Sequence, residues 1–175
     1  MCAIDWAALG TWAAVVLALS FFVLDRIDRR KRDRAEAKII ALLLGTELSI
    51  ISTMARALAA EVATENSAGM LDALLALDEH NRGRIADWAA NLPTETLESV
   101  VGRVHVLPAR AATALMALLS SVRELRLIAD TLRNMSNSEA IENIDAFMPH
   151  FRREAALAGV RARDAVAACD AVATA

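Results

Sequence analysis

The chain contains 175 residues, of which 56% are hydrophobic and 4% aromatic, and its formal net charge at pH 7 is −3. From Ile39 onward there are 12 basic and 17 acidic residues, and this balance argues against a nucleic-acid-binding protein. The abundance of Ala, Leu and Arg and the lack of Tyr favour helices over strands, so we expect an all-α fold.

The first element along the chain is an uncharged segment, residues 6–24, which is nineteen residues long. At about 1.5 Å per helical residue it would cover roughly 28 Å, close to the ~30 Å hydrocarbon thickness of a bilayer. This predicts a transmembrane helix. A cleaved signal peptide would carry basic residues before its apolar core, and a soluble core helix would carry a polar stripe, so both alternatives fit the segment less well.

The charges around this segment predict its orientation. Residues 25–38 carry seven Lys or Arg side chains, whereas residues 1–5 carry none. Under the positive-inside rule, residues 1–5 form a short extracytoplasmic N-terminus and the chain after the span, residues 25–175, lies in the cytoplasm. The chain holds seventeen Arg against two Lys and is rich in Ala, which indicates a bacterial chain of high coding GC content and hence the inner (plasma) membrane.

Two groups of residues are candidate contacts in or at the membrane. Indole rings favour the interface, and basic side chains just outside the bilayer attract lipid headgroups. The predicted membrane-interface residues are Trp6, Trp12, Arg26, Arg29, Arg30, Lys31, Arg32, Arg34 and Lys38. Small residues four apart allow two spanning helices to approach closely, so Gly10, Ala14 and Ala18 are a candidate contact between two copies.

The basic juxtamembrane segment, residues 25–38, is expected to be helical. It contains opposite charges at i,i+4 spacing, such as Asp25 with Arg29, and the first proline of the chain is Pro93. The span and the next helix can therefore form one rod of about sixty residues, roughly 90 Å long.

Residues 39–175 are predicted to form one cytoplasmic domain, an antiparallel bundle of four to five helices. Apolar residues spaced by three and four from Ile40 to Val62 predict a first helix that ends near residue 64. After a turn, a second helix capped by Asn66 or Ser67 is expected to include Ile85 and Trp88, with Gly83 weakening its middle.

The second half of the domain carries clearer signals. A break at residues 91–94 precedes a short helix that begins after Thr94, and Pro108 suits the first position of the next helix. The apolar stripe of that helix runs from Leu115 to Leu132. Ser136 and Glu139 form a capping-box pattern that opens a last helix, in which Pro149 is expected to cause a kink or a division. The predicted buried face of the last helix contains Ile141, Ile144, Met148, Phe151, Ala155, Ala158, Ala162 and Cys169.

Sequence patterns for metal and catalytic sites are missing. None of the three histidines follows a Glu or Asp by three residues, as the di-iron sites of helical bundles require. The sequence also contains no His-Glu-x-x-His, Cys-x-x-Cys or phosphate-binding glycine loop. We therefore expect no catalytic residue, no metal and no cofactor.

The sequence thus predicts a single-pass membrane-anchored interaction or scaffold protein that is not an enzyme. Its expected partners are the lipid bilayer and either another protein or a second copy of itself, with no nucleic acid. The alternative is a membrane-tethered enzyme or small-ligand sensor with a pocket between the helices, formed by polar residues such as Glu61, Asp87, His105 and Arg110.

Overall fold

The structure is a computed structural model that describes residues 6–63 and 68–175, with side chains from Val16 onward except that of Ala68. Every regular element in the described part is helical, which confirms the all-α prediction. The elements are α1 (Trp6–Val62), α2 (Ala68–Leu77), α3 (Glu79–Ala90), α4 (Glu95–Val100), the 3₁₀ helix η1 (Val101–Val106), α5 (Ala109–Asn134) and α6 (Asn137–Thr174).

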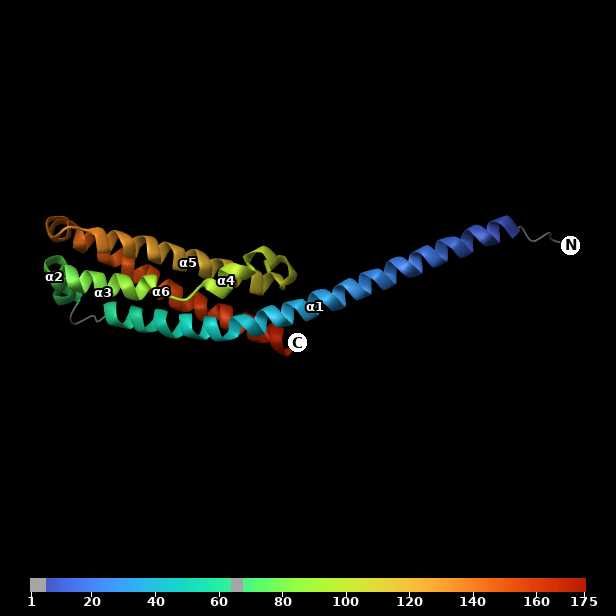
Figure 1. The fold of residues 1–175 in the computed structure, drawn as a ribbon, viewed down its shortest axis with the longest axis horizontal. Coiled ribbons are helices and arrows are strands. Elements are labelled where there is room, and N and C mark those ends of the chain that lie inside the picture. The colour runs from blue at the N-terminus through green and yellow to red at the C-terminus, as the bar shows by residue number, and fades with distance from the viewer. Residues whose placement is uncertain (1–5, 64–67) are drawn as a thin grey trace.

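Helix α1 has two parts with different surroundings. Its first part projects away from the rest of the molecule as a free rod, and its second part lies along the bundle (Figure 1). The side chains of residues 16–35 are all exposed, and Ala37 is the first buried one. The helix is continuous across the charged junction, as predicted, and an ion pair of 2.8 Å joins Asp25 to Arg29.

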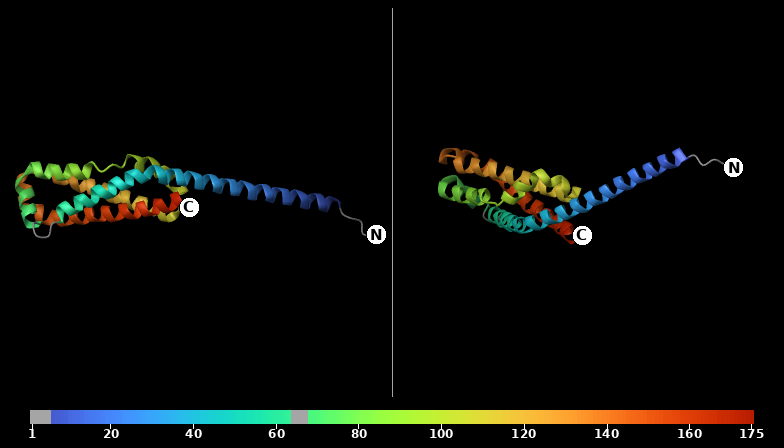
Figure 2. Two further views of the ribbon diagram at one scale, coloured as in Figure 1. Left: turned by 90° about the horizontal axis from the view of Figure 1, so that it is seen from below. Right: turned by 45° about the vertical axis from the view of Figure 1, so that its right-hand side comes forward.

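The bundle is formed by the second part of α1 together with α3, α5 and α6, while α2 crosses its far end (Figures 1 and 2). We call the end of the bundle where α1 leaves it the neck, and the opposite end the distal end. The most extensive packing joins α6 to α1 and to α5. Alanines of α6 allow this approach, and Gly159 lies so close to α1 that an added Cβ would be 3.4 Å from Cγ of Arg56.

The predicted second helix is in fact two helices, α2 and α3. The helix was expected to be weakest at Gly83, but the chain breaks at Asp78. Asp78 separates α2 from α3, because its side chain accepts hydrogen bonds from the backbone N–H groups of His80 (2.9 Å) and Asn81 (3.4 Å). Gly83 lies inside α3 without interrupting it. The predicted caps Asn66 and Ser67 fall outside the described residues.

The last two helices match their predicted patterns with three exceptions. Pro108 was predicted at the first helical position but is the N-cap of α5, because its backbone is extended (ψ 143°). The stripe from Leu115 to Leu132 is buried in α5, and the capping box of Ser136 and Glu139 is present at the start of α6. Ile141 was expected in the core but is 60% exposed. Pro149 lies within α6 and does not divide it.

Candidate functional site

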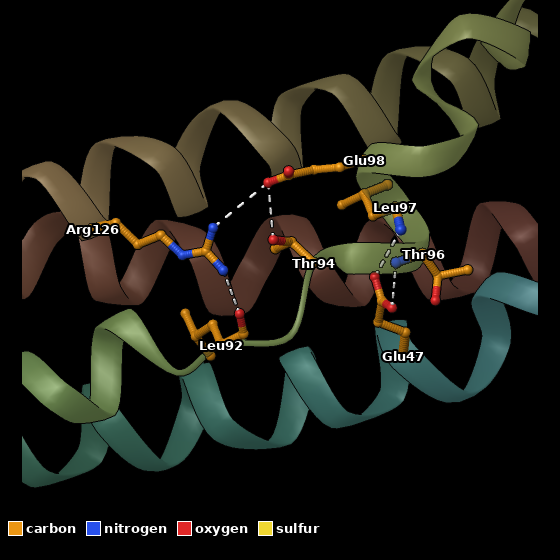
Figure 3. Close-up of polar contacts among 7 residues, drawn as sticks. All are labelled: Glu47, Leu92, Thr94, Thr96, Leu97, Glu98 and Arg126. Carbon is orange, nitrogen blue, oxygen red and sulfur yellow. Dashed lines mark hydrogen bonds and ion pairs between the residues drawn. The ribbon is translucent and has the colours of Figure 1, made fainter.

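A polar cluster fastens the connection between α3 and α4 to the neighbouring helices (Figure 3). Glu47 of α1 accepts hydrogen bonds from the backbone N–H groups of Thr96 (2.9 Å) and Leu97 (2.8 Å). These N–H groups belong to the first turn of α4, where intrahelical acceptors are lacking. A carboxylate from α1 therefore caps α4, although Thr94 occupies the N-cap position.

The other half of the cluster ties the same connection to α5. Arg126 donates a hydrogen bond of 2.6 Å to the carbonyl of Leu92 and lies 3.6 Å from a carboxylate oxygen of Glu98. The hydroxyl of Thr94 donates to that same oxygen at 3.0 Å. Together the two halves hold α4 between α1 and α5, which places η1 and the start of α5 at the neck.

A cavity of 910 Å³ opens at the neck where α1, α5 and α6 converge, and we call it the neck groove. Its apolar lining comes from small side chains near the end of α6 and from the segment before α5. The lining residues are Arg30, Asp33, Arg34, Ala35, Ala37, Lys38, Val106, Pro108, Arg110, Ala111, Ala168, Ala171, Val172 and Ala175.

The neck groove is positively charged. Arg30, Arg34 and Lys38 follow one another at i,i+4 spacing on α1, and Arg110 adds a cation from α5. Within the described part of the chain, none of these four side chains forms an ion pair, and Asp33 is the one acidic side chain in the lining. Excess positive charge beside an apolar surface suits an anionic ligand that has an apolar portion.

A second exposed surface runs along α1 within the bundle. The apolar side chains of Ile39, Leu42, Leu43 and Ile50 are between 45% and 62% exposed. They lie on the side of α1 opposite its buried residues, and Thr46, Thr53 and Ala57 continue the same face. We call these seven residues the α1 strip.

The predicted membrane-interface residues all lie on α1, but they do not act as one unit. Arg26, Arg29, Lys31 and Arg32 are exposed outside the neck groove, whereas the other three described basic residues line it. Ala18 is exposed on the projecting part. Trp6, Trp12, Gly10 and Ala14 fall where the structure gives no side chains. Sequence periodicity could not reveal the groove, because it forms only when three helices meet.

The four polar residues of the predicted pocket are divided between the two ends of the bundle. Glu61 lies 3.6 Å from Arg84, and Asp87 lies in a surface depression of α3 at the distal end. Arg110 lines the neck groove, and His105 is exposed on η1. Among the residues whose side chains the structure describes, no group of three His, Cys, Asp or Glu could hold a metal ion.

Comparison with known proteins gave no relative that could indicate a function for this chain. No protein-family model, no curated protein and no solved structure matches this chain.

Proposed function

We propose that this chain is a single-pass membrane protein whose helical bundle lies in the cytoplasm and acts by binding another protein chain. The α1 strip would be the binding surface. The observation that carries this proposal is the exposure of apolar side chains along α1, both on its projecting part and on the bundle. The proposal assigns no reaction to the chain.

The projecting part of α1 supports the membrane anchor. By length and composition α1 can cross a bilayer, and the uncharged residues 6–24 belong to its projecting part. Leu17, Phe21 and Phe22 are exposed by 59%, 70% and 61%, and no other element of the bundle covers them. Burying a side chain of this size contributes about 1.5 to 3 kcal/mol, so a row of them favours transfer into lipid. The basic residues after the span favour a cytoplasmic bundle.

The α1 strip supports a protein partner. Ile39, Leu43, Thr46, Ile50, Thr53 and Ala57 are separated by alternating steps of four and three residues. This is the spacing by which two helices pack side by side in a coiled coil. Two copies anchored in the same direction would place identical strips at the same height above the membrane. Parallel self-association is therefore the simplest form of the proposed interaction.

The test is in-membrane cross-linking of the full chain followed by affinity purification and mass spectrometry. Leu42→Glu with Leu43→Glu changes the strip, and Leu127→Glu is the control because Leu127 of α5 is 64% exposed and lies elsewhere. We expect wild type and control to recover the same cross-linked chain, either a second copy or one other protein. The strip variant should lose it. Equal recovery with all three proteins would contradict the proposed surface.

A separate measurement tests the anchor. Carbonate extraction should leave the wild type and both variants in the membrane pellet, because none of the changes touches residues 6–24. Release of the wild type into the soluble fraction would refute the membrane assignment, whatever the cross-linking shows.

A further inference from the structure

We propose that the neck groove binds the headgroup of an anionic phospholipid from the membrane leaflet that faces the bundle. This inference rests on the proposed membrane anchor. It goes beyond a general attraction between basic residues and the membrane, because it assigns a defined cavity, a stoichiometric ligand and particular side chains from two helices.

The charge of the groove is the first argument. Arg30, Arg34, Lys38 and Arg110 face one cavity with Asp33 as the single acidic side chain, so the formal charge of the lining side chains is +3. In the described part of the chain no acidic side chain pairs with any of the four cations. Most other arginines of the bundle already have acceptors, such as Arg152 with the carbonyl of Val62 at 2.7 Å. The groove thus holds unneutralised charge that a phosphate can satisfy.

The start of α5 adds a second source of positive potential. Pro108 occupies the N-cap position, and its side chain cannot accept a hydrogen bond from the first turn. Pro108, Arg110 and Ala111 line the groove, so the N-terminus of a 26-residue helix lies beside it. The free N–H groups and the helix dipole at such an end favour a bound phosphate, whereas the C-terminal end of α6 on the other side of the groove has a dipole of the opposite sign, so the four cations supply most of the positive potential.

The apolar part of the lining distinguishes a lipid from free phosphate. Ala37, Val106, Ala168 and Val172 line the groove beside its cations, and 910 Å³ is far more space than one phosphate requires. Small side chains at the end of α6 leave this space open. A ligand that combines a phosphate with an adjoining apolar portion would use both parts of the surface.

The position of the groove identifies the source of such a ligand. Arg30 follows the last residue of the span, Leu24, by six positions, or about 9 Å of helix. The headgroup layer extends roughly 5 to 7 Å beyond the hydrocarbon on each side of a bilayer. The Arg30 end of the groove therefore lies next to the headgroups, and the Lys38 end extends away from them. Anionic phospholipids are the phosphate-bearing amphiphiles at that place.

The test is native mass spectrometry of the full chain in neutral detergent, titrated with phosphatidylglycerol and, separately, with phosphatidylcholine. Arg34→Gln with Arg110→Gln removes two groove cations. Arg123→Gln with Arg163→Gln removes the same charge from exposed sites of the bundle outside the groove. A third variant, Ala171→Trp, fills the apolar side of the groove from an exposed position.

We expect wild type and the control pair to bind one phosphatidylglycerol at least tenfold more tightly than phosphatidylcholine. The variant that lacks two groove cations should lose roughly thirtyfold in that affinity, since each cation near an anionic lipid contributes on the order of 1 kcal/mol. Ala171→Trp should also bind phosphatidylglycerol more weakly, because its indole ring occupies the apolar side of the groove. Equal losses in the control pair would overturn the site in favour of diffuse attraction. Displacement of the lipid by millimolar inorganic phosphate would overturn the lipid assignment.

Failure of the lipid site can be distinguished from failure of the proposed membrane anchor. If carbonate extraction shows a membrane protein but the groove variants bind lipid as the wild type does, the groove proposal alone fails. If carbonate releases the wild type from the membrane, the proposed membrane anchor is refuted, and the lipid site that rests on it is refuted as well.

Discussion

Arg82 is the largest fully buried side chain of the described residues. Its Nη1 donates to the carbonyls of Leu75 (2.7 Å) and Ala76 (3.3 Å), and its Nη2 donates to the carbonyl of Met135 (2.9 Å) and to Oδ1 of Asn137 (2.7 Å). The three carbonyls lie at or just beyond the C-terminal ends of α2 and α5, where intrahelical donors are lacking and the helix dipole is negative. One guanidinium therefore joins two helix ends without a carboxylate.

Replacing this guanidinium should destabilise the folded state. We expect Arg82→Ala to lower the free energy of unfolding by about 3 kcal/mol or more, because it leaves several buried carbonyls without donors. The control is Arg84→Ala on the same helix, where the side chain is 52% exposed and its ion pair with Glu61 is 3.6 Å long. That change should cost less than about 1 kcal/mol. Urea unfolding of the full chain in detergent, followed by circular dichroism, gives both values, and similar values would contradict the role of Arg82.

At the scale of the element, the start of α6 is the best example of a local sequence pattern that forms the predicted structure. The Ser136 hydroxyl accepts from the backbone N–H of Glu139 at 3.3 Å, and a Glu139 carboxylate oxygen accepts from the backbone N–H of Ser136 at 2.9 Å. Hydrogen bonds from the side chain and backbone of Ser136 lower the pKa of the Glu139 carboxyl below its usual value.

This lowered pKa predicts a pH dependence with a definite sign. A carboxyl whose pKa is lower in the folded state stabilises the fold above its unfolded pKa and loses that contribution as the pH falls through its folded pKa. We expect Glu139→Gln to reduce the acid sensitivity of unfolding between about pH 5 and pH 3, whereas Glu142→Gln, on the exposed side of the same helix, should leave it unchanged. Unfolding midpoints in urea across that pH range test this, and parallel curves for all three proteins would contradict it.

Sequence reasoning was accurate where one helix determines its own environment. The stripe of α5 and the capping box of α6 depend on spacing within one segment, so both were predictable. The helix cap at Asp78 was not predicted, because the polar cluster of residues 78–84 is equally typical of a solvated loop, a frayed helix junction or a cap. The roles of Arg82 and Glu47 could not be read from the sequence, since their hydrogen-bond acceptors and donors lie on other helices. The neck groove was missed for the same reason.

At the scale of the whole molecule, α1 carries three surfaces in succession along its length: its projecting part, its residues in the neck groove and the α1 strip. The projecting part and the part along the bundle can be followed in Figure 2. On the proposed membrane anchor, a change in the tilt or rotation of the spanning part would therefore reach the groove and the strip through a single helix. Within the bundle, Glu47 of α1 binds the first turn of α4, and Arg126 of α5 binds the connection just before it. These hydrogen bonds link α1 to α5 through α4.

The orientation of the whole chain can be tested with its own cysteines. On the proposed topology Cys2 lies outside and Cys169 lies inside, buried in α6, where burial raises the pKa of its thiol to about 11. At pH 8 about one thousandth of such a thiol is ionised, so Cys169 should not react in the folded protein. A membrane-impermeant maleimide should label Cys2 in intact cells, and a Cys2→Ser variant should not be labelled. Adding Ala146→Cys, at an exposed position of α6, to that variant should restore labelling only after the cells are permeabilised. Labelling of this introduced thiol in intact cells would show that the proposed topology is inverted. The neck groove and the α1 strip would then lie on the opposite side of the membrane.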